Sequence, residues 1–292
     1  MPTPESHRTF RTSRNSMTTF LAQLTDLHIR EPGRLTYRRI DTAQYLERTV
    51  QSVLALPQQP HALVITGDLT DFGRPAEYAH LRSLLAPLGT LPVYLLPGNH
   101  DDRDALRTAF PEHPWLRSEG FIQYAVDIGA LRLIALDTVV PGHSEGALCE
   151  ERLQWLELQL AASEGRPVVI AMHHPPFETL IGHMDKIGLL QGAQALEDLV
   201  RRHPNVQRVI CGHLHRSIQV AFGGTVAMTS PAPAHQVCLD LAPDAASAWT
   251  LEPPGFMLHA LPPGGRLVSH AVASGQFDGP HPFWDAQGRL ID

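Results

Sequence analysis

Seven aspartate, asparagine and histidine side chains follow short apolar segments of this sequence, and all seven carry atoms that bind metal ions. They are Asp26, His28, Asp68, Asn99, His173, His213 and His215. Carboxylate, amide and imidazole donors without a thiolate suit first-row ions such as Mn, Fe, Co or Zn, whereas imidazole is a poor ligand for calcium. One ion takes about four to six donors, so seven protein ligands indicate two ions that share a carboxylate. Asp68, which follows the central segment, is the natural bridge.

The chemistry that such a pair of ions supports is displacement at phosphorus. Two ions a few ångströms apart can hold a shared hydroxide at neutral pH and clamp both the attacking and the leaving oxygen. Each motif alone is weak, because Asp-x-His also serves loop hydrogen bonding, and because alternate residues such as His213 and His215 face opposite ways unless a turn reunites them. The joint occurrence of these motifs and Asp137 at six strand ends favours a metal site over a purely structural explanation.

The elements that must position these side chains are short buried strands. Apolar runs that end on polar turns occupy residues 20–24, 62–65, 93–96, 131–136, 168–171 and 209–210. Apolar side chains at three- and four-residue spacing predict amphipathic helices over residues 40–54, 75–85, 150–160 and 191–202. Residues 121–126 and 131–136 flank a turn and predict an antiparallel hairpin. In layered α/β folds such strand-end loops converge on one edge of the sheet, where ligands bind.

The composition disfavours several classes of partner. The 292 residues carry a net charge of −7, and without a cluster of Lys and Arg this argues against nucleic acid and anionic membranes. No segment reaches the roughly 18 consecutive apolar residues of a membrane span. Three widely spaced cysteines without a CxxC pair (Cys149, Cys211 and Cys238) indicate a reducing compartment, the cytoplasm. We expect Cys211 in the core rather than on a metal.

Five motifs in order along the chain resemble those of the calcineurin-like metallophosphoesterases. They are Asp26-x-His28, Gly67-Asp68, Gly98-Asn99-His100-Asp101, His173 and Gly212-His213-x-His215. The resemblance is closer still to the bacterial class III cyclic nucleotide phosphodiesterases and their glycerophosphodiesterase relatives. The added matches are Leu35-Thr36-Tyr37, Asp137-Thr138, Pro141-Gly142-His143, Met172-His173-His174-Pro175-Pro176 and His235-Gln236-Val237. Together the motifs cover residues 20–241.

The resemblance implies a specific metal centre of two Fe, Mn, Zn or Co ions. One ion would be held by Asp26, His28, Asp68 and His215, and the other by Asp68, Asn99, His173 and His213. His100 would contact the phosphate or protonate the leaving oxygen. Asn99, His213 and His235 would also contact the substrate.

The resemblance also implies an α/β fold, a four-layer αββα sandwich of two mixed β-sheets flanked by helices. Many family members dimerise through the β element after the last motif, so we expect a homodimer or a higher homo-oligomer. Four segments are predicted: a flexible N-terminal extension (1–18), a metallophosphoesterase catalytic domain (19–216), a β extension or cap (217–265) and a C-terminal tail (266–292). Within the cap, strands are expected at 218–222, 225–228, 236–241 and 256–261.

Asp71 has two readings. Asp71 lies three residues after Asp68, so its carboxylate could orient His100, as in the protein phosphatase branch. Turn preference equally allows Asp71 to be a solvated turn residue before Phe72-Gly73. Purple acid phosphatases have a tyrosine ligand at this position, so that branch is disfavoured.

The remaining histidines are not expected to bind metal. His174 is expected to pack in the interior or to lie behind the ligands, and His143 and the other scattered histidines are expected at the surface or rim.

The predicted function is hydrolysis of small phosphodiesters, either 3',5'-cyclic nucleotides or glycerophosphodiesters, by attack of a metal-bridging hydroxide. Among enzymes, the alternatives are a phosphomonoesterase and a nuclease, and the acidic composition disfavours the nuclease. A catalytically silent binding scaffold of the same fold is the alternative from a different class, although such scaffolds typically lose metal ligands and all seven are present here. No residue of the rim loops 30–37, 141–146 and 175–188 distinguishes one leaving group from another.

Overall fold

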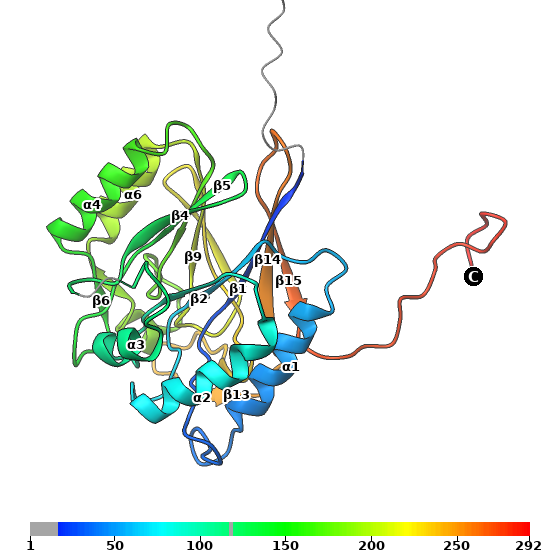
Figure 1. Cartoon of the computed structure of the whole chain (residues 1–292), viewed down its shortest axis with the longest axis horizontal. Helices are drawn as coiled ribbons and strands as arrows, with labels where there is room; N and C mark the ends of the chain where they lie inside the picture. The colour runs from blue at the N-terminus through cyan, green and yellow to red at the C-terminus, as the bar shows by residue number, and fades with distance from the viewer. Residues whose placement is uncertain (1–16, 117–118) are drawn as a thin grey trace, which may run out of the picture.

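The computed structural model describes residues 17–116 and 119–292, and two packed β-sheets form its centre (Figure 1). In the five-stranded sheet, two antiparallel strands extend three parallel ones. Its spatial order is β15 (Val268–Ala273), β14 (Gly255–Leu261), β1 (Thr19–Leu24), β2 (Ala62–Thr66) and β3 (Val93–Leu96). Strands β1, β2 and β3 therefore all end at the same edge of this sheet.

The six-stranded sheet is also mixed. Its spatial order is β10 (Ile218–Phe222), β11 (Thr225–Thr229), β9 (Val206–Cys211), β7 (Val168–Ala171), β5 (Leu131–Ala135) and β4 (Tyr124–Ile128). The four inner strands are parallel, and the edge strands β4 and β10 run antiparallel to them. The hairpin predicted at 121–136 is confirmed as β4 and β5, with β4 beginning at Tyr124.

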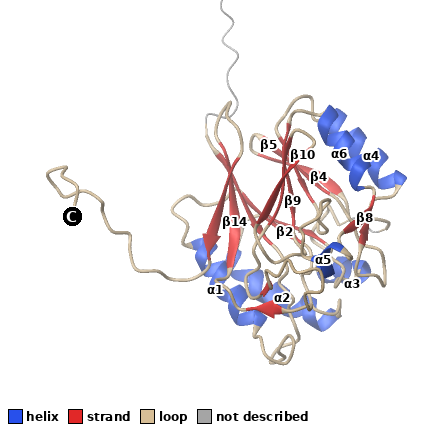
Figure 2. Ribbon diagram, turned by 180° about the vertical axis from the view of Figure 1, so that it is seen from behind, coloured by secondary structure: helices blue, strands red, loops and turns tan. Residues whose placement is uncertain are grey.

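Helices cover the outer faces of both sheets (Figures 1 and 2). Helices α1 (Thr42–Leu54) and α2 (Pro75–Leu85) pack on the five-stranded sheet, and α4 (Glu150–Ala161) and α6 (Ala193–Arg202) on the six-stranded one. The remaining elements are α3 (Arg103–Ala109), the 3-10 helix Ala86–Leu88, α5 (Gly182–Asp185), β6 (Gly146–Ala147) paired with β8 (Leu189–Gln191), and β12 (Gln236–Val237) paired with β13 (Trp249–Thr250). The predicted αββα sandwich is confirmed.

Alternation along the strands explains why the six-stranded sheet is buried on both faces. In β7, Val169 and Ala171 belong to the core shared with the five-stranded sheet, whereas Val168 and Ile170 pack with α4 and α6. Full burial of each such valine or isoleucine is worth about 1.5–3 kcal/mol. Cys211, at the end of β9, lies in the same helix-side core, as predicted.

Helix α1 shows how local sequence fixes the elements that carry the site. The Asp41 side chain accepts a hydrogen bond from the backbone N–H of Gln44 and caps the first turn. Leu46, Val50 and Val53 recur at helical spacing and are buried against the sheet. The helix therefore holds the loop between β1 and α1 over the strand ends.

Two predictions beyond residue 216 need correction. The predicted tail from 266 contains β15, which pairs with β14 over six residue pairs. Each of its residues is exposed or half-buried, so β15 lacks the buried apolar run that marks the other predicted strands. The strand expected at 236–241 ends at Val237, because the chain turns where the N–H of Asp240 donates to Cys238 O.

The two ends of the chain differ in what the structure describes. Residues 1–16 of the predicted N-terminal extension lie outside the described residues. The chain after β15 runs away from the sheets (Figures 1 and 2) and exposes the large side chains of Phe277, Phe283 and Trp284. Throughout the described segments, no helix is long and apolar enough to cross a membrane.

Candidate metal centre

Tight turns carry the polar side chains that follow β1, β2 and β9. The backbone is left-handed at five of the seven predicted ligands, with φ of 53° at Asp26, 45° at His28, 48° at Asp68, 70° at His213 and 53° at His215. This conformation costs an L-residue about 1–2 kcal/mol and concentrates at functional sites. It supplies the turn that an extended His-x-His segment lacks, so the His213 and His215 rings both face the centre.

Two glycines allow the loops to approach closely. A Cβ on Gly98 would lie 2.3 Å from Asp68 Oδ1, and a Cβ on Gly67 would lie 2.4 Å from Nδ1 of His173. Gly67 also has a φ of +93°. Any side chain at these positions would push the ligands apart, which explains the glycine in the Gly-Asp and Gly-Asn-His motifs.

The first group of ligands surrounds the Nε2 atoms of His28 and His215, which lie 3.3 Å apart. Asp26 Oδ1 lies 3.4 Å from His215 Nε2, and Asp68 Oδ2 lies 3.6 Å from His28 Nε2. The Nδ1 atoms of both rings face acceptors, Asp71 Oδ1 at 3.2 Å and the carbonyl oxygen of His235 at 3.1 Å. Because Nδ1 donates in each ring, each neutral ring presents a lone pair at Nε2. With both rings neutral and both carboxylates ionised, four acceptor atoms converge, an arrangement that fits a cation.

The second group surrounds Nε2 of His173. Asn99 Oδ1 lies 3.1 Å, His213 Nδ1 3.3 Å and Asp68 Oδ2 3.4 Å from this atom. Nδ1 of His173 donates to the carbonyl oxygen of Thr66 at 2.8 Å, so Nε2 of the neutral ring again presents a lone pair. The residues present therefore fit a second ion beside the first.

Asp68 lies between the two groups. Its Oδ2 approaches both His28 and His173, while Oδ1 accepts the backbone N–H of His100 at 2.9 Å. Burial alone would raise the pKa of this carboxyl, but the neighbouring His173, His100 and His28 rings hold it well below its usual range. An ionised Asp68 shared by two ligand groups is the geometry expected of a bridging carboxylate.

Burial shifts the pKa of three other predicted ligands, Asp26, His213 and His215. It raises the pKa of Asp26 to about 6 and lowers the pKa of His213 to about 3 and that of His215 well below its usual value. Burial also opposes protonation of His173, but the Asp68 carboxylate outweighs it and raises the pKa of His173 to about 9. In the metal-free chain, Asp68 and His173 thus favour the charged forms of one another.

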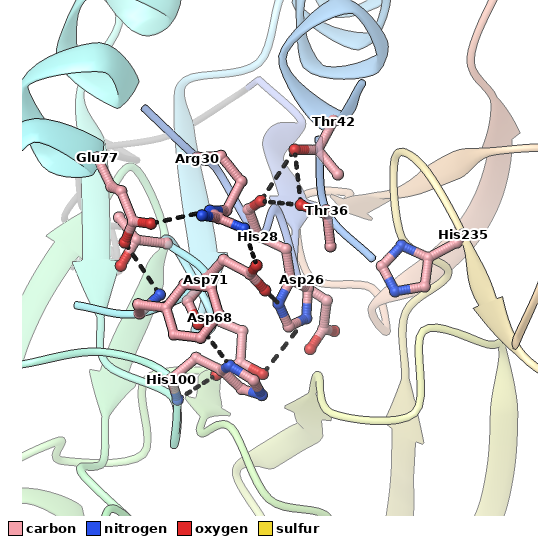
Figure 3. Close-up of polar contacts among 12 residues, drawn as sticks. Asp26, His28, Arg30, Thr36, Thr42, Asp68, Asp71, Glu77, His100 and His235 are labelled. Atoms are coloured by element: carbon pink, nitrogen blue, oxygen red, sulfur yellow. Dashed lines mark hydrogen bonds and ion pairs between the residues drawn. The ribbon is translucent and has the colours of Figure 1, made fainter. Parts of the chain in front are cut away.

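The role expected of Asp71 needs correction. Its carboxylate faces His28 at 3.2 Å and the Arg30 guanidinium at 3.4 Å, as Figure 3 shows. Nδ1 of His100 instead donates to the backbone carbonyl oxygen of Asp71 at 2.8 Å. The side chain therefore orients His28, a predicted metal ligand, and the main chain orients His100. Asp71 is buried, which also excludes the solvated turn residue.

A cavity of about 370 Å³ opens beside the ligands. Its lining includes all four predicted substrate contacts, Asn99, His100, His213 and His235. It also includes four residues without a predicted role: Tyr37 and His183 from the predicted rim loops, and Ser247 and Trp249 from the predicted cap. Tyr37 belongs to the Leu35-Thr36-Tyr37 motif. Nothing in the sequence near Trp249 indicates that the 238–250 segment returns to the metal centre.

Asp101 belongs to the Gly-Asn-His-Asp motif, but the sequence alone does not assign it a role. Its half-buried carboxylate accepts the backbone N–H groups of Gly98, Leu69 and Thr70 at 2.9–3.2 Å. It therefore ties the loop after β2 to the loop after β3 and keeps Asp68 beside Asn99.

Three other histidines can be compared with the expectations from the sequence. His174 lies behind the ligands as expected, with Nδ1 2.7 Å from Thr138 Oγ1 and Nε2 donating to the carbonyl oxygen of Ser144. His143 is an exposed rim residue beside Glu145. His259, expected at the surface or rim, is instead fully buried in β14.

Comparisons with known proteins agree with this geometry. The sequence model of the calcineurin-like phosphoesterase family matches residues 21–217. A probable glycerophosphodiester phosphodiesterase GpdQ of Arcobacter nitrofigilis is 35% identical over 272 residues, covering 93% of this chain and 99% of that protein. The 3',5'-cyclic adenosine monophosphate phosphodiesterase CpdA of Pseudomonas aeruginosa is 30% identical over 249 residues, covering 85% and 87%. A dimetal phosphatase structure from Danio rerio has a TM-score of 0.59 at 17% identity, covering 88% and 99%, and shows the fold alone.

The chain belongs to the calcineurin-like phosphoesterase family. The predicted family, sandwich fold and phosphoester-hydrolysing class are therefore confirmed. Buried His and Asp groups that could hold metal ions recur around Asp26, His28 and His173, which agrees with the dinuclear centre of this family.

Proposed function

We propose that the chain is a phosphodiesterase that depends on two metal ions and hydrolyses small phosphodiesters. The observation that carries the proposal is the convergence of two ligand groups on one carboxylate, Asp68. The relatives named as glycerophosphodiester and cyclic nucleotide phosphodiesterases support a diester substrate. Asp26, His28, Asp68 and His215 would hold one ion, and Asp68, Asn99, His173 and His213 the other. When bound, two first-row ions supply Lewis acidity and a water of lowered pKa.

The chain's own residues bind and orient the diester. Asn99, His100 and His213 line the cavity next to the ligands, so a phosphate there lies within reach of an amide and two imidazoles. His100 is fixed by its Nδ1–H bond to the Asp71 carbonyl oxygen, which leaves Nε2 to face the substrate. A protonated His100 would give its Nε2 proton to the leaving alkoxide oxygen, as a general acid does.

Metal identity, compartment and assembly are parts of the same proposal. The ligand set favours Fe, Mn, Zn or Co, and we propose iron or manganese. The three cysteines are free, which supports the cytoplasm. Exposed Leu239, Leu241 and Leu251 on one segment beside the cavity support a homodimer through this segment. Sedimentation of the protein with and without Leu239→Ser and Leu241→Ser tests the dimer, and an unchanged monomer in both would overturn it.

The test of the function is hydrolysis by metal-reconstituted protein. Bis(p-nitrophenyl) phosphate is compared with p-nitrophenyl phosphate, with 3',5'-cyclic AMP and glycerophosphoethanolamine alongside and Asn99→Ala as the control. We expect faster cleavage of the diester, abolished by Asn99→Ala. Faster cleavage of p-nitrophenyl phosphate would instead indicate a phosphomonoesterase, and no turnover with any metal would indicate a binding scaffold.

A further inference from the structure

Aromatic rings extend outward from the metal ligands in layers. The His235 ring lies 4.6 Å from that of His215 and 5.5 Å from that of His28, measured between centroids. Tyr37 and Trp249 form the next layer, 5.3 Å and 6.1 Å from His235. A ligand whose phosphate binds at the metals would therefore pass His235 before it reaches this outer pair.

The outer pair has the geometry of a stacking platform. The Tyr37 and Trp249 rings are 5.7 Å apart with an interplanar angle of 16°, and both line the 370 Å³ cavity. Tyr37 remains 49% exposed, so a stacked neighbour does not cover it fully. A flat heteroaromatic group can extend such a stack, and stacking on an aromatic side chain is a common way to hold a nucleobase.

His235 lies between the metals and the platform with both ring nitrogens unpaired. The side chain is only 1% exposed, and neither Nδ1 nor Nε2 has a hydrogen-bond partner among the described residues. In Figure 3 the ring stands apart from the network around Asp71. An unpaired buried polar group is costly, and a hydroxyl of a sugar placed between the phosphate and the platform would pair with it.

The charges of the cavity select against an ionic leaving group. Among the described residues, no Lys or Arg side chain lines it, and Asp68, which would bind the metals, is the only carboxylate in its lining. The ammonium group of glycerophosphoethanolamine would therefore find no free counter-charge. Met184, Ile187 and Val237 make part of the lining apolar, which suits an uncharged base.

We propose that this cavity is a nucleoside subsite, in which Tyr37 and Trp249 stack on the base and His235 binds the sugar of a cyclic nucleoside monophosphate. The inference rests on the proposed function and narrows its substrate class. It also makes Trp249 a specificity-determining residue contributed by the 238–250 segment.

The experiment compares the metal-loaded wild type with Trp249→Leu and Trp249→Phe on three substrates: 3',5'-cyclic AMP, glycerophosphoethanolamine and glycerophosphocholine. We expect Trp249→Leu to lower kcat/KM for cyclic AMP about tenfold relative to glycerophosphoethanolamine, mainly through KM, and Trp249→Phe to restore most of it. Quenching of tryptophan fluorescence by adenosine 5'-monophosphate, but not by glycerol 3-phosphate, should disappear in Trp249→Phe. The quenching should persist in Trp284→Leu, because Trp284 lies on the exposed C-terminal segment.

Several results would overturn the subsite. One is an equal loss on all three substrates, which would mark a structural role for Trp249. Another is a loss confined to glycerophosphocholine, which would mark a cation–π site for a quaternary ammonium. Unchanged cyclic AMP hydrolysis in Trp249→Leu would remove the inference but leave the phosphodiesterase standing, whereas absence of hydrolysis in the wild type would remove both.

Discussion

Oδ1 of Asp71 lies 3.2 Å from Nδ1 of His28 and directs the opposite nitrogen of that ring to the metal centre. A carboxylate in this position fixes the tautomer and raises the basicity of the ligand. We expect Asp71→Ala to weaken binding of the ion at His28 by about 10- to 100-fold. Asp71→Asn, which keeps an acceptor oxygen, should lose less.

Metal titration of both variants, with the occupancy measured by elemental analysis, checks this expectation. Arg30→Gln is the matched control, because it removes the other partner of the Asp71 carboxylate and leaves the contact with His28. Equal dissociation constants for Asp71→Ala and the wild type would show that His28 needs no support from this carboxylate.

Replacement of Asp68 should affect both ions. Its Oδ2 faces both ligand groups, so Asp68→Asn removes the shared negative charge and should reduce the metal content below one ion per chain. Asn99→Ala removes a ligand from the His173 group alone and should retain one tightly bound ion. Stoichiometry after dialysis against a weak chelator separates the two variants. Two retained ions in Asp68→Asn would rule out the bridge.

His100 should matter most when the leaving group is poor. If its Nε2 proton goes to the leaving oxygen, His100→Ala should slow hydrolysis of cyclic AMP, which has an alkoxide leaving group, by about 10²- to 10⁴-fold. Bis(p-nitrophenyl) phosphate has a stable phenolate leaving group and should be slowed much less. Kinetics at constant metal occupancy test this, with the exposed rim residue His143 replaced by alanine as the control. The same factor on both substrates would limit His100 to phosphate binding.

The convergence of the predicted ligands could be expected from the sequence, because each of them follows a buried apolar strand. The strands that lead to Asp26, Asp68 and Asn99 are parallel neighbours, so their C-terminal ends meet without information from distant segments. The left-handed backbone at Asp26 and Asp68 was not predictable in this way, because it reflects tertiary contacts rather than local propensity.

What the sequence could not show depends on long-range placement. The Asp71 side chain turns toward His28 rather than His100 because Arg30 holds its other oxygen. Trp249 reaches the cavity only because the 238–250 segment folds back to pair β13 with β12 beside His235. In both cases the deciding contacts join residues that are far apart in the chain or that sit in loops without periodicity.

The buried His259 should limit stability in acid. Burial, with Arg208 and His270 nearby, lowers the pKa of His259 to about 3, and its ring nitrogens lie 2.8 Å from Ser269 Oγ and 3.1 Å from Gln23 Oε1. The unfolded chain binds a proton at this ring below its ordinary pKa of about 6.5, whereas the folded chain does so only near pH 3. The free energy of unfolding should therefore fall as the pH decreases from about 6.5, by at most about 1.4 kcal/mol per pH unit from this group.

The effect of His259 on stability is measured by urea unfolding between about pH 7 and about pH 4, roughly the range in which its contribution changes. The metal is removed with a chelator beforehand, so metal release does not affect the result. His259→Gln keeps polar atoms near Ser269 and Gln23 but cannot take up the proton, so its stability should depend less steeply on pH than that of the wild type. His270→Gln, at an exposed position on the neighbouring strand, should keep the steep dependence. Parallel curves for His259→Gln and the wild type would mean that His259 is protonated equally in the folded and unfolded chains.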